Sequence, residues 1–178
     1  MLRIATLDDA SRIEALMKES IAALFPHFYN ERQSESAVRY VAQVDSMLLE
    51  DGTYFALESG DELVACGGWS KRDKLYTGSG ESSGDVRVLD PSREPARVRA
   101  MFVRADWTRR GLGRRILVEC EAAARRDGFR QLSLVATLAG LPLYLAYGFQ
   151  PLEEYEVTMP DGVALACVSM EKPIDTAS

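Results

Sequence analysis

The sequence predicts a single α/β domain, residues 1–178, and three observations support this prediction. Apolar residues recur at helical spacing near residues 10–21 and 112–120. Strand-like runs flank two polar turns, Ser59-Gly60-Asp61-Glu62 and Met159-Pro160-Asp161-Gly162, which are typical of β-hairpins. With 178 residues and 47% hydrophobic content, the chain can bury one substantial core but is short for two domains.

The N-terminal part predicts a short strand followed by two helices. Residues 2–5 are apolar apart from Arg3, and Thr6 with the acidic residues Asp8 and Asp9 can cap a helix. The apolar face of this helix is formed by Ala10, Ile13, Leu16, Met17 and Ile21. Pro26 ends the helix within an aromatic segment, residues 24–30. A second helix follows, with an apolar face formed by Ala37, Tyr40, Val41 and Val44.

The middle of the chain predicts a hairpin and then an irregular segment. Strand-like runs at 53–58 and 63–70 flank the first turn. The second run contains Gly67-Gly68, a pair that marks a bulge or the close approach of another backbone or a ligand. Residues 71–95 carry repeated Gly and Ser without periodicity, so we expect an irregular loop or flap, either a substrate lid or a surface insertion.

The second half alternates strands and helices. Strand-like runs lie at 97–103, 131–136, 152–158 and 163–171. The helix after the first of these runs has two arginines in its last turn and Gly128 after it, which is a stop signal. Pro142 suits the first turn of a short helix. We expect residues 173–178 to form a flexible C-terminal tail.

Residues 99–117 combine a strand, a basic glycine loop and the start of a helix. The first turn of a helix has N–H groups without internal partners, and the helix dipole adds positive charge there. Gly111 and Gly113 leave room for a phosphate, and arginines surround them. The pattern fits a pyrophosphate, and it equally fits a tight turn before a solvated basic helix. Ile116 in place of a third glycine excludes a dinucleotide fingerprint, and Arg114-Arg115 in place of Lys-Ser/Thr excludes a P-loop.

Charge and cysteine content restrict the function. The formal net charge of -6 argues against a general nucleic-acid binder, so the basic loop suits a small anionic ligand better. Cys66, Cys120 and Cys167 are widely spaced, which indicates reduced core thiols, and no metal-ligand spacing is present. No apolar run approaches the roughly 20 residues that cross a bilayer, and the N-terminus lacks a signal-peptide core. We therefore expect a cytoplasmic protein with no membrane segment and no metal.

The glycine loop and a second motif downstream together resemble the GCN5-related N-acetyltransferase (GNAT) family. In that family, a Gln/Arg-x-x-Gly-x-Gly/Ala loop precedes a Tyr-x-x-x-Gly-Phe segment. Here the loop glycines are Gly111 and Gly113, Thr108 takes the leading position, and residues 144–149 form the second motif. The resemblance covers about residues 97–158 and depends on the order and spacing of both motifs. It implies a mixed, mostly antiparallel central sheet of about seven strands flanked by about four helices.

The resemblance also implies acetyl-CoA as co-substrate. In the family, the fourth strand holds the pantetheine arm through backbone hydrogen bonds, which here assigns Met101 and Val103, and a backbone N–H near Met101 polarises the thioester carbonyl. The arm enters a notch between the fourth and fifth strands. Thr137 falls where relatives often have an Asn that contacts the cofactor. The loop residues assigned to the coenzyme are Arg109, Arg110, Gly111, Leu112, Gly113 and Arg114.

Acetyl transfer requires an acid for the departing thiolate, and the resemblance assigns this role to Tyr144. A phenol with a reference pKa of about 10 is protonated at neutral pH and donates its proton as charge develops on sulfur. Tyr147 is a local competitor, but only Tyr144 has the family's spacing to Gly148-Phe149. The alternative interpretation is a core aromatic that anchors a short helix. The strand at 97–103 offers no carboxylate, so the general base is unassigned.

The acceptor is expected to be a primary amine of a small molecule or a peptide. Phe25 and Phe28 fall in the segment that forms part of the acceptor wall in the family, and Trp69 follows the paired glycines. Each of these aromatics is also compatible with plain packing. Arg99 lies on the fourth strand, where it would repel a cationic acceptor or hold an acidic one.

Two other classes of protein make different predictions. A non-catalytic acyl-CoA-binding or regulatory module would bind the nucleotide without acetyl transfer, and Tyr144→Phe would change nothing beyond binding. A nucleic-acid-binding domain would show steep salt dependence and would lose binding when Arg109 and Arg110 are both replaced, but the acidic balance disfavours it. A homodimer is left open. The sequence therefore predicts an acetyl-CoA-dependent N-acetyltransferase that acts by direct attack of the amine.

Overall fold

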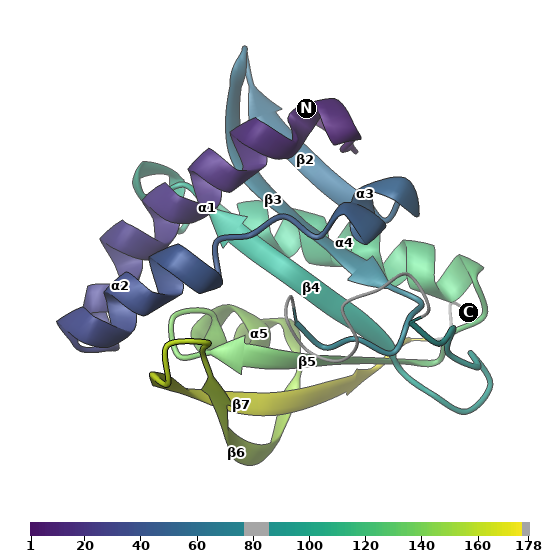
Figure 1. The fold of residues 1–178 in the computed structure, drawn as a ribbon. Helices are drawn as coiled ribbons and strands as arrows, with labels where there is room; N and C mark the ends of the chain where they lie inside the picture. The colour runs from purple at the N-terminus through teal and green to yellow at the C-terminus, as the bar shows by residue number, and fades with distance from the viewer. Residues whose placement is uncertain (77–85, 176–178) are drawn as a thin grey trace.

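The computed structural model describes residues 1–76 and 86–175, and its centre is one seven-stranded sheet (Figure 1). The strand order is β1-β2-β3-β4-β5-β7-β6. The strands are β1 (Leu2–Ile4), β2 (Tyr54–Ser59), β3 (Glu62–Ser70), β4 (Ala96–Val103), β5 (Gln131–Thr137), β6 (Gln150–Thr158) and β7 (Ala164–Pro173). Neighbouring strands are antiparallel except β4 and β5, which are parallel. The predicted α/β fold with a mostly antiparallel sheet is confirmed.

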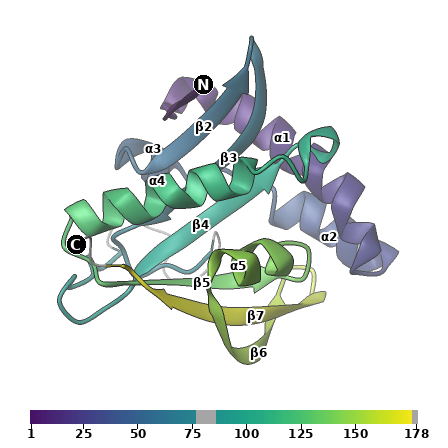
Figure 2. The same ribbon diagram turned by 180° about the vertical axis from the view of Figure 1, so that it is seen from behind.

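Helices cover both faces of the sheet. On one face lie α1 (Ala10–Leu24) and α2 (Glu31–Tyr40), and on the other lie α4 (Leu112–Arg126) and α5 (Leu141–Tyr147), as the two opposite views show (Figures 1 and 2). The predicted apolar faces of α1 and α4 pack against the sheet, since this arrangement removes their side chains from water. The buried residues on these stripes include Ile13, Leu16, Met17 and Ile21 of α1 and Ile116, Leu117 and Cys120 of α4. Two apolar clusters, one on each side of the sheet, form the core.

The second helix is shorter than its apolar pattern predicted, and another helix follows it. Because α2 ends at Tyr40, the apolar residues Val41 and Val44 lie beyond it. The helix α3 (Ser46–Glu50) then begins where the Asp45 side chain accepts a hydrogen bond from the Met47 N–H at 3.1 Å. Five residues are too few to show a helical period, so the pattern did not reveal α3. The described residues thus form five α-helices, against about four expected.

The strands β4 and β5 diverge soon after they meet. They pair at only two positions of β4, Ala96 and Arg97. Farther along, β4 bends at Ala100, which has a positive φ of 50° and whose carbonyl accepts a hydrogen bond from the Tyr54 hydroxyl at 2.6 Å. A register shift in the pairing of β3 with β4 accompanies this bend. As a result, the second half of β4 has no strand partner on its β5 side within the described part of the chain.

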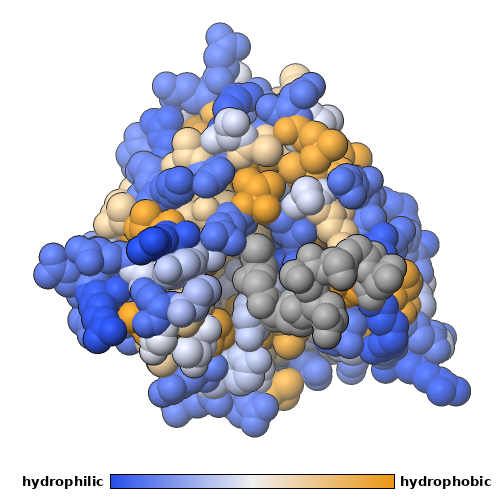
Figure 3. Space-filling view, in the orientation of Figure 1, coloured by the Kyte–Doolittle hydropathy of each residue, from blue (hydrophilic) through white to orange (hydrophobic). Residues whose placement is uncertain are grey.

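Two predicted segments lie partly outside the described residues. The ends of the loop 71–95 meet in an isolated antiparallel bridge between Arg72 and Val88, but residues 77–85 are not described, so the lid and the insertion both stay predictions. The last three residues of the predicted tail 173–178 are likewise not described. None of the described helices is both long enough and apolar enough to cross a membrane. On the face seen in Figure 1, hydrophilic side chains predominate at the outline and hydrophobic patches lie within it (Figure 3).

Candidate active site

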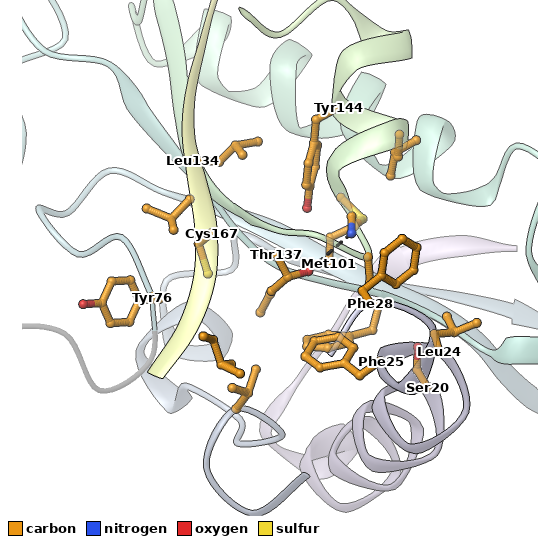
Figure 4. Close-up of a pocket in the computed structure, with 18 of the residues that line it drawn as sticks. Ser20, Leu24, Phe25, Phe28, Tyr76, Met101, Leu134, Thr137, Tyr144 and Cys167 are labelled. Carbon is orange, nitrogen blue, oxygen red and sulfur yellow. Dashed lines mark hydrogen bonds between the residues drawn. The ribbon is translucent and has the colours of Figure 1, made fainter. Parts of the chain in front are cut away.

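A cavity of about 610 Å³ lies where β4 and β5 diverge (Figure 4). Its walls come from the end of α1 and the turn after it, from β4, β5 and β7, from the start of α4 and from α5. These segments are far apart in the sequence, and the fold brings them together around one space. The predicted site residues that line this cavity are Phe25, Phe28, Arg99, Met101, Val103, Arg109, Gly113, Thr137 and Tyr144.

The loop before α4 provides a cationic end of the cavity. Gly111 caps α4 with a φ of +78°, a left-handed conformation that favours glycine, and a Cβ at this position would meet no atom within 4 Å. Arg109 lines the cavity and also has a positive φ, of 64°. The N–H groups of the first helical turn, from Leu112 onward, have no acceptor within the helix. An open glycine position, free N–H groups and a guanidinium together fit a phosphate-bearing group.

Four of the six loop residues predicted for this role do not line the cavity: Arg110, Gly111, Leu112 and Arg114. Gly111 and Arg114 line a separate hollow that also includes residues of β1. The Arg110 guanidinium stacks on the Trp107 ring, 4.4 Å from its centroid, and that of Arg114 lies 5.3 Å from the centroid of the Tyr147 ring. The Leu112 side chain packs into the core beneath α4. Successive helical residues point in different directions, so a continuous run of cations cannot turn every side chain toward one ligand.

Gly113 permits the close packing of two helices. A Cβ on this residue would lie 2.7 Å from Cδ2 of Leu143 on α5. The absence of a side chain at Gly113 lets the Leu143 methyl group pack against α4 in this position, and a larger residue would require the Leu143 side chain to shift. The prediction gave this glycine the role of admitting a ligand, and the structure adds a packing reason that motif spacing did not reveal.

Tyr144 projects from α5 into the cavity (Figure 4). The residue is buried, and its ring packs edge-on against Phe149 with the centroids 5.8 Å apart. Pro142 lies in the first turn of this short helix, as predicted, and Gly148 is its C-terminal cap. Burial raises the pKa of Tyr144 above its ordinary value, so the phenol stays protonated at neutral pH. Within the described part of the chain, its hydroxyl has no hydrogen-bond partner.

Tyr147, the local competitor, has a hydroxyl that is already engaged. This hydroxyl donates to Oε2 of Glu121 at 2.6 Å, and Nζ of Lys172 donates to Oε1 of the same carboxylate at 2.7 Å. Burial and the hydrogen bond to Glu121 raise the pKa of Tyr147. Because Tyr147 does not line the cavity, the geometry favours Tyr144 as the group that can meet a reacting atom.

The other end of the cavity contains the predicted aromatic wall. Phe25 is 4% exposed and Phe28 is 45% exposed, so Phe25 both lines the cavity and fixes the end of α1 to the sheet. Tyr29, the next aromatic residue, lies behind this wall, where its hydroxyl donates to the Ala166 carbonyl at 2.7 Å and accepts from the Leu138 N–H at 3.0 Å. Both partners are more than 100 positions away in the sequence, so no local pattern could have identified this positioning role.

Trp69 lies away from the cavity, although it was predicted beside the acceptor. It is buried in the apolar cluster that contacts α4, where its ring packs edge-on against Phe129 with the centroids 5.9 Å apart. Side chains alternate between the two faces of a strand, and this alternation directs Trp69 to the α4 face. The acceptor wall is on the α1 side of the sheet. The position of Trp69 therefore agrees with a packing role and not with contact to the acceptor.

Arg99 lines the cavity as part of a buried ionic cluster. Its Nη2 lies 3.1 Å from Oδ2 of Asp45, and Nζ of Lys74 lies 3.2 Å from the same oxygen. Burial opposes the charge of Asp45, but the two cations outweigh this effect and lower the pKa of Asp45. Burial also lowers the pKa of Arg99. Sequence analysis missed Asp45 and Lys74, because nothing near them in the chain indicates contact with the fourth strand.

Comparison with known proteins assigns this fold to a family. A family model described as the acetyltransferase (GNAT) family matches residues 17–149, which include both predicted motifs and most of the cavity wall. The chain therefore belongs to the GNAT family, and the resemblance found in its motifs is confirmed.

Solved structures share the fold at low sequence identity. A GCN5-related N-acetyltransferase from Rhodopseudomonas palustris has a TM-score of 0.73 at 19% identity, covering 97% of this chain and 94% of its own. PaiA N-acetyltransferase from Thermoplasma acidophilum, in complex with coenzyme A, has a TM-score of 0.67 at 14% identity, with 97% and 98% covered. The protein yncA from Salmonella typhimurium, with its cofactor acetyl-CoA, has a TM-score of 0.62 at 18% identity, with 100% and 95% covered. No curated protein matches the sequence.

Proposed function

We propose that this protein is an N-acetyltransferase that transfers the acetyl group of acetyl-CoA to a primary amine of a small molecule or peptide by direct attack. Acetyl transfer follows from the family, whereas the amine acceptor is our proposal. The observation that carries it is the Tyr144 hydroxyl, which points into the cavity between the diverging strands (Figure 4).

Acetyl-CoA is the co-substrate and supplies the acetyl group as a thioester. The N–H groups at the start of α4 and the Arg109 guanidinium would hold its phosphates. The second half of β4, with Met101 and Val103, has no strand partner on its β5 side among the described residues and would provide backbone groups for the amides of the coenzyme's arm. Thr137 lines the cavity while its Oγ1 accepts a hydrogen bond from the Gly140 N–H at 3.3 Å, so its main contribution is to shape the turn into α5.

In the proposed reaction, the amine nitrogen forms a bond to the acetyl carbon as the carbon–sulfur bond breaks. Tyr144 donates its proton to the sulfur, and a backbone N–H near Met101 polarises the acetyl carbonyl. The nitrogen releases one proton, which balances the proton that sulfur gains once Tyr144 is reprotonated. The described residues that line the cavity include no Asp or Glu but do include His27, so the nitrogen's proton passes to water or to this imidazole.

A non-catalytic acyl-CoA-binding module is the alternative. A buried tyrosine with only a packing role usually places its hydroxyl on a hydrogen-bond partner, as Tyr147 does with Glu121. The hydroxyl of Tyr144 instead faces the cavity, which favours catalysis. We further propose a cytoplasmic protein that acts without a nucleic-acid or membrane partner.

The test is a calorimetric titration with acetyl-CoA, with ATP at the same ionic strength as control, followed by a coenzyme A thiol-release assay with added amines. We expect acetyl-CoA to bind more tightly than ATP and the thiol to appear faster when an amine is present. Binding without amine-dependent release would favour the non-catalytic module. If acetyl-CoA fails to bind, the donor site is assigned wrongly.

A further inference from the structure

The paired glycines of β3, Gly67 and Gly68, make room for two different neighbours. A Cβ on Gly68 would lie 2.8 Å from Cα of Tyr54 and closer still to the carbonyl oxygen of Thr53, so the backbone of β2 could not stay where it is. A Cβ on Gly67 would lie 2.7 Å from Sδ of Met101. Because successive residues of a strand face opposite sides of the sheet, Gly68 admits Tyr54 on the α1 side and Gly67 admits Met101 on the α4 side.

The strand β4 changes the direction of its side chains at Ala100. Before this residue, Ala96 and Val98 belong to the apolar cluster on the α4 side, and after it Met101 and Val103 pack against the same cluster. Val98 and Met101 are three positions apart, whereas residues on one face of a regular strand are an even number apart. The extra residue and the positive φ of Ala100 indicate a β-bulge, which turns the residues that follow.

Tyr54 holds this bulge in place. The residue is 2% exposed, and its hydroxyl donates to the Ala100 carbonyl at 2.6 Å. A φ of 50° is unfavourable for a residue with a Cβ, and this hydrogen bond offsets the cost. Burial raises the pKa of Tyr54, so the hydroxyl keeps the proton that it donates. Tyr54 does not line the cavity, and any effect on a ligand there must pass through Ala100.

The Ala100 carbonyl and the Met101 N–H belong to one peptide unit. Every peptide bond of the described residues is trans, and in a trans peptide the C=O and N–H groups point in opposite directions. Because β2 and β3 lie on one side of β4, the bond from Tyr54 draws the carbonyl to that side and turns the N–H to the β5 side, where the cavity lies. Within the described residues, Met101 has no register partner on β3 or β5, so no strand competes with a ligand for this N–H.

We propose that Tyr54 is a positioning residue for acetyl transfer, because its hydroxyl holds the bulge at Ala100 and thereby aims the Met101 N–H at the thioester carbonyl. This inference rests on the proposed function, in which that N–H polarises the carbonyl, and it names the residue that sets the direction. A donor aimed before the substrate binds stabilises the charge that develops on the carbonyl oxygen without having to reorganise. Loss of the hydroxyl should therefore slow the chemical step and leave coenzyme binding nearly unchanged.

Infrared spectroscopy of bound acetyl-CoA, labelled with ¹³C at its acetyl carbonyl, tests the direction of the N–H. A hydrogen bond weakens the C=O bond and lowers its stretching frequency, so we expect a lower frequency on the wild type than on Tyr54→Phe. Equal frequencies on the two folded proteins would overturn the inference. The measurement needs no acceptor. If the frequencies differ but no amine is acetylated, the proposed function falls while the positioning of the N–H stands.

Thiol-release kinetics separate positioning from a general loss of stability. We expect Tyr54→Phe to lower kcat about tenfold or more, with less than about a twofold change in the KM for acetyl-CoA. Asp9→Asn is the control, because Asp9 is buried, pairs with Arg3 at 2.7 Å and does not line the cavity. It should lower the free energy of unfolding and leave kcat unchanged. An unchanged kcat in Tyr54→Phe, or an equal loss in the control, would contradict the positioning role.

A second substitution tests whether the bulge is the link between Tyr54 and the cavity. Glycine adopts a positive φ without the cost that a Cβ imposes, so Ala100→Gly should help to preserve the bulge when the hydroxyl is absent. We expect the double variant Tyr54→Phe, Ala100→Gly to exceed Tyr54→Phe in kcat by about threefold or more. A double variant that recovers no activity would contradict a role of Tyr54 through Ala100.

Discussion

The two ends of the cavity are assembled in different ways. The coenzyme end is formed almost entirely within residues 97–149, by a strand, a loop, a helix and the short α5 that follow one another along the chain. The acceptor end collects side chains from the turn after α1, the end of α2 and β5 to β7. A continuous stretch leaves a motif in the sequence, but an assembled surface leaves none. The sequence therefore indicates the donor more readily than the acceptor.

The strongest test of the coenzyme end is Tyr144→Phe. Because this change removes the proton donor but keeps the ring that packs on Phe149, we expect kcat to fall about 100-fold or more. The affinity for acetyl-CoA should stay near that of the wild type in a calorimetric titration. Tyr147→Phe is the matched control, since it removes a hydroxyl from the same helix that does not face the cavity, and its kcat should change little. Similar losses in both variants would remove the acid role from Tyr144.

The corresponding test of the acceptor end is Asp45→Asn. Asn preserves the cap of α3, but it leaves Arg99 and Lys74 without the carboxylate that pairs with both. We expect the free energy of unfolding in urea to fall by about 3 kcal/mol, because one partner of a buried ion pair is lost. Glu14→Gln is the control, since it breaks an exposed pair with Lys18 one helical turn away and should cost about 0.3 kcal/mol. Equal losses of unfolding free energy in the two variants would show that the buried ion pairs of Asp45 stabilise the fold no more than an exposed pair does.

The wild type and Asp45→Asn also give a prediction for the pH dependence of stability. The folded structure lowers the pKa of Asp45 below its unfolded value of about 3.9. The stabilisation is therefore fully present above the unfolded pKa and is lost as the pH falls through the folded one. The stability difference between wild type and Asp45→Asn should be constant from about pH 5 to 7 and should shrink below about pH 4. A difference that widens on acidification would contradict the direction of the shift.

Gly113→Ala tests why the loop ends in a glycine. The new Cβ would press on the Cδ2 methyl of Leu143, which is the far end of a half-buried, rotatable side chain, so we expect the free energy of unfolding to fall by about 1 kcal/mol. Leu143→Ala in the same chain should relieve the contact, so the double-mutant cycle should show a favourable coupling in the free energy of unfolding. Additive losses would mean that the contact between α4 and α5 does not explain this glycine.

A change of similar size in stability is expected for Gly111→Ala. Alanine in a left-handed conformation costs about 1 kcal/mol of stability, and its methyl group would enter the open space at the start of α4. We expect the affinity for acetyl-CoA to fall about tenfold, which equals about 1.4 kcal/mol. Gly60→Ala, at a hairpin tip with a φ of +61° and equally open surroundings, should lose similar stability but keep the affinity. Equal affinities in the two variants would argue against a phosphate site at Gly111.

The positions of the strands and of both motifs could be predicted from local sequence. The strand-like apolar runs and the two hairpin turns identified all seven strands within two residues of their observed ends. The pattern overextended the second helix to Val44 and missed α3, because apolar residues outside a helix can also be buried and five residues show no period. Short elements and the ends of elements depend on tertiary contacts.

The sequence by itself determined the fold class, and through the family resemblance it predicted the coenzyme end of the site and the candidate Tyr144, because each depends on residues close together in the chain. The tertiary structure alone decided that Trp69 faces away from the cavity and that Arg99 is paired with Asp45. It also decided that Tyr29 joins the ends of β5 and β7. The physical reason is that local spacing encodes periodicity and turn geometry, whereas burial and ion pairing depend on which distant segments meet when the chain folds.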